Sequence, residues 1–192
     1  THNGEEEIIF SLFNRLKLEI TDLILIIAPR HPERAQSISN KALKNGFLNK
    51  NIKFLNSPNY NERPYNSKIS LIVLHAISLP PNVYGKNYVE DFFMNELNAS
   101  EHNYFYEIKD LKVSSHLYIK RNGKMIQFVP LNKRAWHAGE SSYKGIEDCN
   151  DYSIGIELEG SDSDYFSDEQ YKMLIKTTKA IIRNYSDIDK DK

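Results

Sequence analysis

The sequence contains a single cysteine, Cys149, among its 192 residues. One thiol cannot form a disulfide within the chain, which favours a reducing compartment. An excess of either charge is also missing, because 25 basic residues stand against 26 acidic ones. This balance lacks the strongly basic character that nucleic acid or an anionic membrane attracts, so we expect neither as a partner. The first seven residues are polar or acidic and do not resemble a secretory signal, so we predict a cytoplasmic protein.

Long hydrophobic runs are absent too. The longest apolar run covers residues 23–28, whereas a membrane-spanning helix needs roughly 20 apolar residues. We therefore expect no membrane span, and the run is typical of a strand buried on both faces. With 40% hydrophobic and 27% charged residues, the composition is that of a globular protein, which we expect to be a monomer. A typical domain has about 150 residues, so the length allows one domain and a shorter piece.

Residues 1–50 are predicted to form a helix, a strand and a second helix. An acidic first turn and an apolar stripe favour the first helix over residues 4–18. The stripe consists of Ile8, Ile9, Leu12, Phe13 and Leu16. The apolar run at 23–28 is the expected strand, and a helix over residues 33–45 ends at Gly46. These elements are too few to stand as a domain of their own.

A change in composition to Asn, Ser, Pro and Tyr places a domain boundary near Asn51. Beyond it the pattern predicts strands at 69–75, 113–121, 124–130 and 153–159, and helices at 88–97 and 167–185. Asn122-Gly123 is a strong hairpin signal, and Ser167 with Gln170 makes a capping box. On the helix at 88–97, the residues expected to be buried are Val89, Phe92, Phe93 and Leu97. On the helix at 167–185, they are Tyr171, Leu174, Ile175, Thr178, Ile181 and Ile182. The predicted fold class is α/β (mixed α+β), with a mixed central β-sheet flanked by helices and preceded by the short helix-strand-helix piece.

Histidines provide the first candidates for chemistry. His75 ends a predicted strand, where ligand crevices open in α/β proteins, so it is a candidate metal ligand or base. A histidine that caps the strand through backbone hydrogen bonds is the alternative. His116 begins another strand, and His137 follows Trp136, the only tryptophan. A tryptophan beside a histidine and Gly139 is typical of a sugar pocket, because an aromatic face stacks on a pyranose, but it also fits a loop anchored by its tryptophan.

Two carboxylates alternate with apolar residues in the last predicted strand. Glu157 and Glu159 point to one face, while Ile154, Ile156 and Leu158 point to the other. On an uncovered face such acids are simply solvated. If that face is instead the floor of a cleft, one carboxylate can serve as a general base. Periodicity leaves both interpretations open.

Four ordered segments carry a family resemblance. They are LIVLHAISLPP at 71–81, VSSH at 113–116, VPLNKRAWHAG at 129–139 and CNDYSIGIELEG at 149–160. Together they resemble the zinc-dependent N-acetylmuramoyl-L-alanine amidases, and most of all the cytosolic anhydromuramyl-peptide amidases of peptidoglycan recycling. The resemblance runs from about Leu55 to the end of the chain.

The resemblance implies hydrolysis of the amide between the lactyl group of (anhydro)muramic acid and L-alanine of the stem peptide. It implies a zinc ion that activates water, with His75 as the first ligand and Glu157 as the catalytic carboxylate. The residues that it places beside the metal or along the muropeptide cleft are Tyr104, His116, Trp136 and His137.

One departure from the family pattern concerns the metal. The family's second histidine ligand and its aspartate ligand follow the long helix, and the sequence ends at Lys192 before a segment of that kind. We therefore expect a C-terminally shortened domain that binds zinc poorly and has little activity as it stands. The alternative is a metal-free muropeptide-binding module.

Residues 1–50 resemble a different family. The segments THNGEEE at 1–7 and IIAPRHPER at 26–34 resemble the C-terminal half of the Kdo (3-deoxy-D-manno-octulosonic acid) transferases of lipid A assembly. There Arg30 and His31 would lie near the phosphate of the sugar nucleotide. Because 50 residues cannot build a donor site, we expect no transferase activity. We expect instead that a gene fusion, a fused reading frame or an assembly error joins this fragment to the amidase domain at 51–192.

Overall fold

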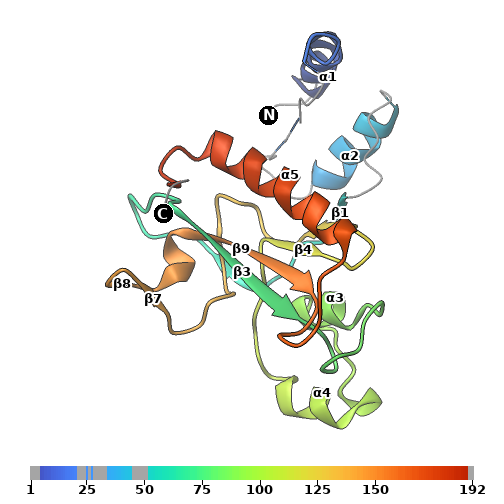
Figure 1. Ribbon diagram of the computed structural model, residues 1–192, viewed down its shortest axis with the longest axis vertical. Coiled ribbons are helices and arrows are strands. Elements are labelled where there is room, and N and C mark those ends of the chain that lie inside the picture. The colour runs from blue at the N-terminus through green and yellow to red at the C-terminus, as the bar shows by residue number, and fades with distance from the viewer. Residues whose placement is uncertain (1–4, 21–24, 26, 28–33, 45–51, 190–192) are drawn as a thin grey trace.

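The computed structural model describes residues 5–20, 25, 27, 34–44 and 52–189 of the chain (Figure 1). A five-stranded sheet lies at its centre, in the order β1-β5-β4-β9-β3. The strands are β1 (Ile52–Phe54), β5 (Met125–Gln127), β4 (Leu117–Ile119), β9 (Ser153–Glu159) and β3 (Leu71–Ile77). β4 and β5 are antiparallel, and the other neighbouring pairs are parallel. The predicted mixed sheet is confirmed.

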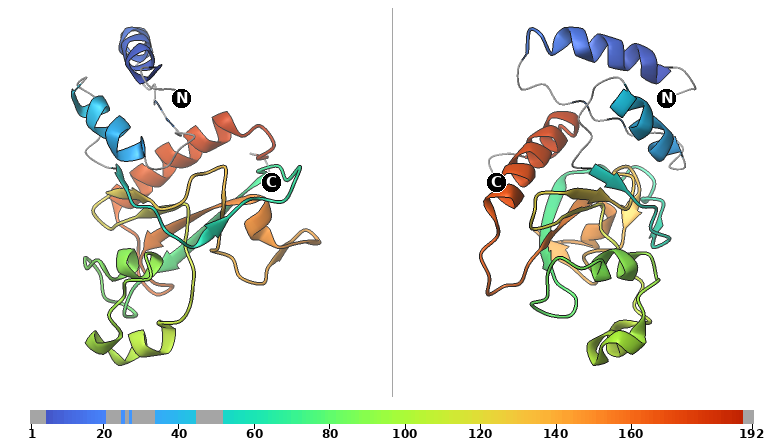
Figure 2. Two further views of the ribbon diagram at one scale, coloured as in Figure 1. Left: turned by 180° about the vertical axis from the view of Figure 1, so that it is seen from behind. Right: turned by 90° about the vertical axis from the view of Figure 1, so that its right-hand side faces the viewer.

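Helices cover both faces of this sheet. Helix α5 (Asp168–Asn184) lies on one face, and α3 (Tyr88–Phe93) and α4 (Asn103–Ile108) lie on the other (Figure 2). Ile154 and Ile156 pack with Ile181 on the α5 side, whereas Tyr118 packs with Phe93 on the α3 side. The minor elements are β2 (Tyr60–Asn61), which pairs with β6 (Arg134–Ala135), the hairpin of β7 (Ser142–Tyr143) and β8 (Ile146–Glu147), and the 3-10 turns η2 (Ala99–Glu101) and η3 (Cys149–Asp151).

Two local sequence signals are confirmed by the backbone. Gly123 has φ of 75°, and its N–H donates to the Lys120 carbonyl at 2.8 Å, so Asn122-Gly123 turns the β4–β5 hairpin as predicted. At the start of α5 the Gln170 N–H donates to Ser167 Oγ at 3.1 Å, and the Ser167 N–H donates to Gln170 Oε1 at 3.0 Å. This reciprocal pair is the capping box that the sequence indicated.

The buried face of α5 differs from the predicted stripe. Ile181 is buried as expected, but Tyr171 and Ile175 remain 48% and 51% exposed. The buried side of the helix is formed by Gln170, Thr177, Ala180 and Ile181. The Gln170 amide donates to the carbonyls of Ile119 and Glu159, which fixes the beginning of the helix over the ends of β4 and β9. A polar side chain therefore sets the rotation of α5, and the apolar stripe alone does not reveal it.

In residues 1–50, the buried side of the first helix also differs from the predicted stripe. Helices α1 (Glu5–Leu16) and α2 (Ala35–Lys44) form, and Phe10 and Phe13 are buried. Glu6 lies on the same stripe, is fully buried, and forms ion pairs with Arg34 and Lys41. The buried side therefore follows positions 6, 10 and 13, because the buried Glu6 must face its cations.

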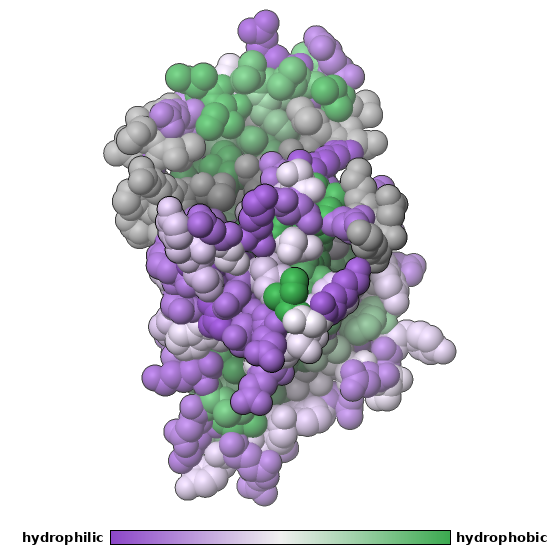
Figure 3. Space-filling view, turned by 90° about the vertical axis from the view of Figure 1, so that its left-hand side faces the viewer, coloured by the Kyte–Doolittle hydropathy of each residue, from purple (hydrophilic) through white to green (hydrophobic). Residues whose placement is uncertain are grey.

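Three other residues of the expected stripe of α1 face solvent, since Ile8 is 71% exposed, Leu12 55% and Leu16 40%, whereas Ile9 is half-buried. Figure 3 shows hydrophobic side chains gathered at the end of the molecule that α1 occupies. The predicted strand at 23–28 lies outside the described residues except for Leu25 and Ile27, which pack against the small core of α1 and α2. Gly46 and the boundary at Asn51 also lie outside the described residues.

The other predicted elements appear with shifted ends. The strand expected at 69–75 is observed as β3, and the helix expected at 88–97 ends at Phe93, with Val89, Phe92 and Phe93 buried as predicted. β9 has the predicted bounds. Within the part of the chain that the structure describes, no helix has the length and apolar character to cross a bilayer.

Candidate active site

One row of side chains crosses the sheet on the face that α3 covers. Strand register pairs Ile126 with Tyr118, Tyr118 with Glu157, and Glu157 with His75. Because residues paired across neighbouring strands share a face, Glu157 lies between Tyr118 and His75. His75 is on the edge strand β3 and is half-buried, whereas Glu157 is only 7% exposed.

The Glu157 carboxyl is therefore not solvated, although its strand pattern alone allowed that. Burial raises the pKa of Glu157 to about 8, because a charge is disfavoured away from water. Glu157 Oε2 and the Tyr118 hydroxyl are both buried, and neither has a hydrogen-bond partner among the described residues. A carboxyl whose pKa lies near neutrality can both accept and donate a proton.

His75 and His137 are joined by a hydrogen bond. His75 Nε2 lies 3.0 Å from His137 Nδ1, and His137 Nε2 lies 3.2 Å from Ser153 Oγ. The Ser153 hydroxyl donates to the Cys149 carbonyl at 2.5 Å, so Ser153 Oγ accepts from His137 Nε2–H. His137 Nδ1 then accepts from His75 Nε2–H. This network assigns both tautomers and leaves His75 Nδ1 as the nitrogen without a described partner.

His116 lies beneath this pair and does not reach solvent. Its Nδ1 accepts the Gly155 N–H at 3.0 Å, and its Nε2–H donates to the Lys133 carbonyl at 2.9 Å. Burial lowers the pKa of His116 to about 3, so the ring is neutral at physiological pH. Its ring meets His137 edge-on at 5.6 Å between centroids. In this structure His116 supports His137 from below instead of lining a cleft.

Gly155 makes room for His137 on the sheet. A Cβ at position 155 would lie 2.4 Å from His137 Cγ and 2.5 Å from His137 Cδ2, closer than side-chain atoms approach one another. Only glycine therefore lets the imidazole lie directly on β9. The sequence analysis did not single out Gly155, although a glycine inside a strand of apolar residues is a signal for such a close approach.

A half-buried arginine, Arg63, holds the segments around the site together. The Arg63 guanidinium donates to four backbone carbonyls, those of Leu131 at 3.2 Å, Asn150 at 3.0 Å, Asp151 at 2.9 Å and Ser153 at 2.7 Å. Burial lowers the pKa of Arg63 to about 10, which still leaves it charged at neutral pH. The role of Arg63 could not be predicted, because nothing in a single sequence indicates which carbonyls an arginine will meet.

Asn150 fixes the segment that carries His137. Its Oδ1 accepts the backbone N–H of His137 at 3.0 Å and that of Ala138 at 2.9 Å. Asn150 is buried, and its position in the 3-10 turn η3 ties the turn before β9 to the loop of His137. The backbone of His137 is therefore held at the same time as its ring.

Trp136 and Tyr104 are the remaining predicted site residues. Trp136 precedes His137, and its Nε1–H donates to Asn61 Oδ1 at 2.8 Å. Tyr104 lies on α4 and packs against the core on the α3 side; its backbone N–H donates to His102 Nδ1 at 3.1 Å, and no hydrogen bond among the described residues joins it to His75, His116 or His137. The structure thus brings together His75, His116, His137 and Glu157, places Trp136 beside them, and does not link Tyr104 to them.

The described residues do not fit a zinc site. A hydrolytic zinc ion takes three protein ligands and keeps a fourth position open. Among the described residues, no group of three His, Cys, Asp or Glu side chains could hold a metal ion. His137, the histidine that contacts His75, forms a hydrogen bond to it instead of offering a second ligand atom. No chemical step through zinc follows from this arrangement.

Fold and site together define a candidate hydrolase built around a buried acid-base carboxyl. Residues 65–192, more than half of the chain, match the protein family described as N-acetylmuramoyl-L-alanine amidase. The chain belongs to this family, as the sequence motifs predicted.

Two relatives illustrate the similarity. The 1,6-anhydro-N-acetylmuramyl-L-alanine amidase AmpD of Haemophilus influenzae is 46% identical over 152 residues, which cover 79% of this chain and 82% of that protein. A crystal structure of a selenomethionine derivative of AmpD is similar with a TM-score of 0.70 and 46% identity, over 71% of this chain and 76% of that chain. The expected amidase fold is confirmed.

A further relative belongs to a different class. A 3-deoxy-D-manno-octulosonic acid transferase of Rickettsia typhi is 48% identical over 48 residues, which cover 25% of this chain and 10% of that protein. Because the match covers only 10% of the transferase, it does not support transferase activity for this chain. Arg30 and His31 lie outside the described residues, so their expected place near a phosphate stays a prediction, as do the gene fusion and the division at residue 51.

Proposed function

We propose that this protein hydrolyses the amide bond between 1,6-anhydro-N-acetylmuramic acid and L-alanine of a peptidoglycan stem peptide. The Haemophilus influenzae relative named for this activity supports the proposal, since it is 46% identical over 82% of its length. The observation that carries it is the buried Glu157 beside His75, because amide hydrolysis needs a group that moves a proton.

Glu157 can perform both proton transfers of the reaction. As a carboxylate it takes a proton from water while the water oxygen bonds to the lactyl carbonyl carbon. As a carboxylic acid it then gives that proton to the alanine nitrogen while the C–N bond breaks. The products are a lactyl carboxyl group and a free α-amino group. A pKa of about 8 keeps both forms of Glu157 accessible near neutral pH.

The other residues of the site position the reacting groups. His137 fixes His75 through the 3.0 Å hydrogen bond, and Asn150 fixes the backbone of His137. Trp136 lies at the same loop and offers an aromatic face for the sugar ring. A zinc cofactor, a cytoplasmic location and a monomeric state remain predictions from the sequence.

The test is product release from anhydromuramyl tripeptide, followed by mass spectrometry, with zinc and with a chelator as separate conditions. Wild-type protein should release the L-alanyl peptide, and Glu157→Gln should be at least about 100-fold slower, because general acid-base groups contribute at least that factor. Glu107→Gln, on the exposed side of α4, is the matched control and should retain the wild-type rate. Equal rates for the Glu157 and Glu107 variants would refute the role of Glu157.

A second function is favoured by one observation, the lack of a three-ligand metal group among the described residues. A muropeptide-binding module needs the cleft but no metal. Isothermal titration with anhydromuramyl tripeptide separates the two functions. Binding that zinc leaves unchanged, with intact tripeptide recovered afterwards, supports the binding module, whereas recovery of the L-alanyl peptide supports the amidase.

A further inference from the structure

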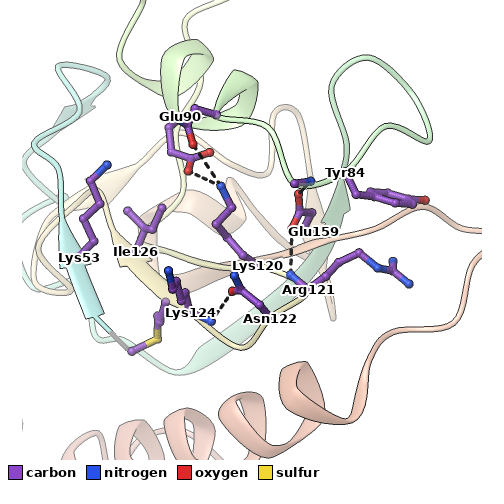
Figure 4. A pocket seen from close by; sticks show the side chains of 12 residues that line it. Lys53, Tyr84, Glu90, Lys120, Arg121, Asn122, Lys124, Ile126 and Glu159 are labelled. Atoms are coloured by element: carbon purple, nitrogen blue, oxygen red, sulfur yellow. Dashed lines mark hydrogen bonds and ion pairs between the residues drawn. The ribbon is translucent and has the colours of Figure 1, made fainter. Parts of the chain in front are cut away.

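A cavity of about 670 Å³ opens beside the β4–β5 hairpin (Figure 4), and neither His75 nor His137 belongs to its lining. Its walls come from β1, the end of β4, the start of β5, α3 and the segment around Tyr84. Its link to the candidate active site is Glu159, which lies two positions after Glu157 on β9 and lines the cavity. None of the steps assigned to Glu157 uses this cavity.

Positive charge dominates the lining. Four cations line the cavity, namely Lys53, Lys120, Arg121 and Lys124. Two carboxylates, those of Glu90 and Glu159, stand against them, so the lining has a net formal charge of +2. Such a focused positive potential attracts anions from solution.

Both carboxylates are already engaged within the protein. Glu90 Oε1 forms an ion pair with Lys120 Nζ at 2.7 Å, and both side chains are largely buried. Glu159 accepts two backbone N–H groups, from Gly85 at 2.5 Å and from Arg121 at 2.8 Å. Glu90 is thus paired with Lys120, and the charge of Glu159 offsets one of the three other cations, which leaves the net charge of +2.

Lys53 and Lys124 are the cations that stay uncompensated. Neither forms a hydrogen bond or an ion pair through its ammonium group within the described part of the chain. Lys53 acts electrostatically on Asp91, which lies outside the lining, but no ion pair joins them. Figure 4 shows Lys53 and Lys120 rising on the same side of the sheet, with Ile126 between them.

Arg121 adds a fourth positive group at the other end. Its guanidinium stacks on the Tyr84 ring at 4.5 Å, and Nη2 donates to the Tyr165 carbonyl at 2.8 Å. Among the described residues, the Arg121 guanidinium contacts no carboxylate. Glu159 instead accepts a hydrogen bond from the Arg121 backbone N–H. Arg121 and Tyr84 thus add a cation and an aromatic surface to the same cavity.

We propose that this cavity binds a dianionic phosphate group, either free phosphate or a phosphate monoester. Two uncompensated ammonium groups match two negative charges, and lysine is a common point-charge partner of phosphate. The volume exceeds that of a bare phosphate, and Ile126 and the Tyr84 ring offer apolar surface to an organic remainder. The proposal does not depend on the amidase activity, because none of these residues belongs to the proposed reaction.

The test is isothermal titration of the full-length protein with inorganic phosphate and, separately, with adenosine monophosphate, at an ionic strength kept constant with chloride. Wild-type protein should show saturable one-site binding of at least one of them. The double variant K53Q/K124Q should raise the Kd at least tenfold. K172Q/K176Q removes two exposed lysines of α5, makes the same change in net charge, and should leave the Kd unchanged.

The two ligands distinguish the source of the phosphate. Tighter binding of adenosine monophosphate indicates a monoester, and equal or weaker binding indicates free phosphate. No saturable binding of either ligand, or the same loss of affinity in both double variants, would overturn the proposal, because the affinity would then not come from this cavity. Circular dichroism of K53Q/K124Q checks that the variant is folded, and ³¹P line broadening gives a second measure of binding.

Discussion

Replacing Gly155 by alanine tests whether contact with the backbone of β9 holds His137 in place. The added Cβ would lie 2.4 Å from His137 Cγ, so the ring has to move by about 1 Å to reach ordinary contact. That movement breaks the hydrogen bonds of His137 to His75, now 3.0 Å, and to Ser153, now 3.2 Å. The change therefore acts on the histidine pair without removing any polar group.

The magnitude follows from two terms. Overpacking of a filled interior costs about 1–3 kcal/mol, and each lost hydrogen bond costs about 1 kcal/mol. We expect Gly155→Ala to lower the free energy of unfolding by about 3–5 kcal/mol, measured by urea denaturation. Activity on anhydromuramyl tripeptide should fall as well, because His75 loses its fixed orientation.

Gly145→Ala is the matched control. Gly145 has φ of 80° and open space around its Cα, so alanine there meets only backbone strain of about 1–2 kcal/mol. In NMR spectra, the chemical shifts of the His137 imidazole should change in the Gly155 variant and remain unchanged in the Gly145 variant. If both variants lose the same stability and leave these resonances unchanged, the contact between Gly155 and His137 does not position the ring.

Three further changes have defined outcomes. His116 binds its proton more weakly when folded, with a pKa of about 3 against about 6.5 unfolded, so its contribution to stability is complete above about pH 6.5 and is lost towards pH 3. Urea denaturation from pH 7 to 4 should therefore show a slope of up to about 1.4 kcal/mol per pH unit from this residue, and His116→Asn should reduce the slope. Arg63→Lys should cost about 2–4 kcal/mol in the same assay, since a lysine cannot serve four carbonyls, whereas the exposed Arg183→Lys should cost under about 0.5 kcal/mol. Ser167→Ala should lower the thermal unfolding midpoint through the loss of about 1 kcal/mol of capping, and an unchanged midpoint would contradict the role of the capping box.

Local patterns predicted much of the fold because they depend on neighbours in sequence. The Asn122-Gly123 turn, the capping box at Ser167 and the alternation in β9 all arise within a few residues, and all three are confirmed. The rotation of α1 and α5 could not be predicted in this way. Glu6 faces inward because Arg34 and Lys41 lie there, and Gln170 faces inward because Ile119 and Glu159 offer carbonyls. Those partners are distant in sequence.

The protonation behaviour of the candidate site could not be predicted from local patterns either. Alternation placed Glu157 on the face opposite to Ile156, but it could not tell whether that face is covered. The structure shows that Glu157 is only 7% exposed, and this burial raises its pKa to about 8. Burial, and not residue type alone, therefore sets the pKa of Glu157.

The supporting network around His137 extends this reasoning to residues that the sequence analysis missed. Arg63 binds backbone carbonyls, so the side chains at Leu131 and Asp151 are irrelevant to these hydrogen bonds, and the sequence carries no record of them. The arrangement is nevertheless specific, because four carbonyls from two segments, one at Leu131 and one at residues 150–153, converge on one guanidinium. It follows that Asp151→Asn should leave the hydrogen bonds of Arg63 intact, whereas any substitution of Arg63 loosens η3, the start of β9 and the loop of His137 together. A site held in this way tolerates changes in the residues around it but not in the one cation that joins their backbones.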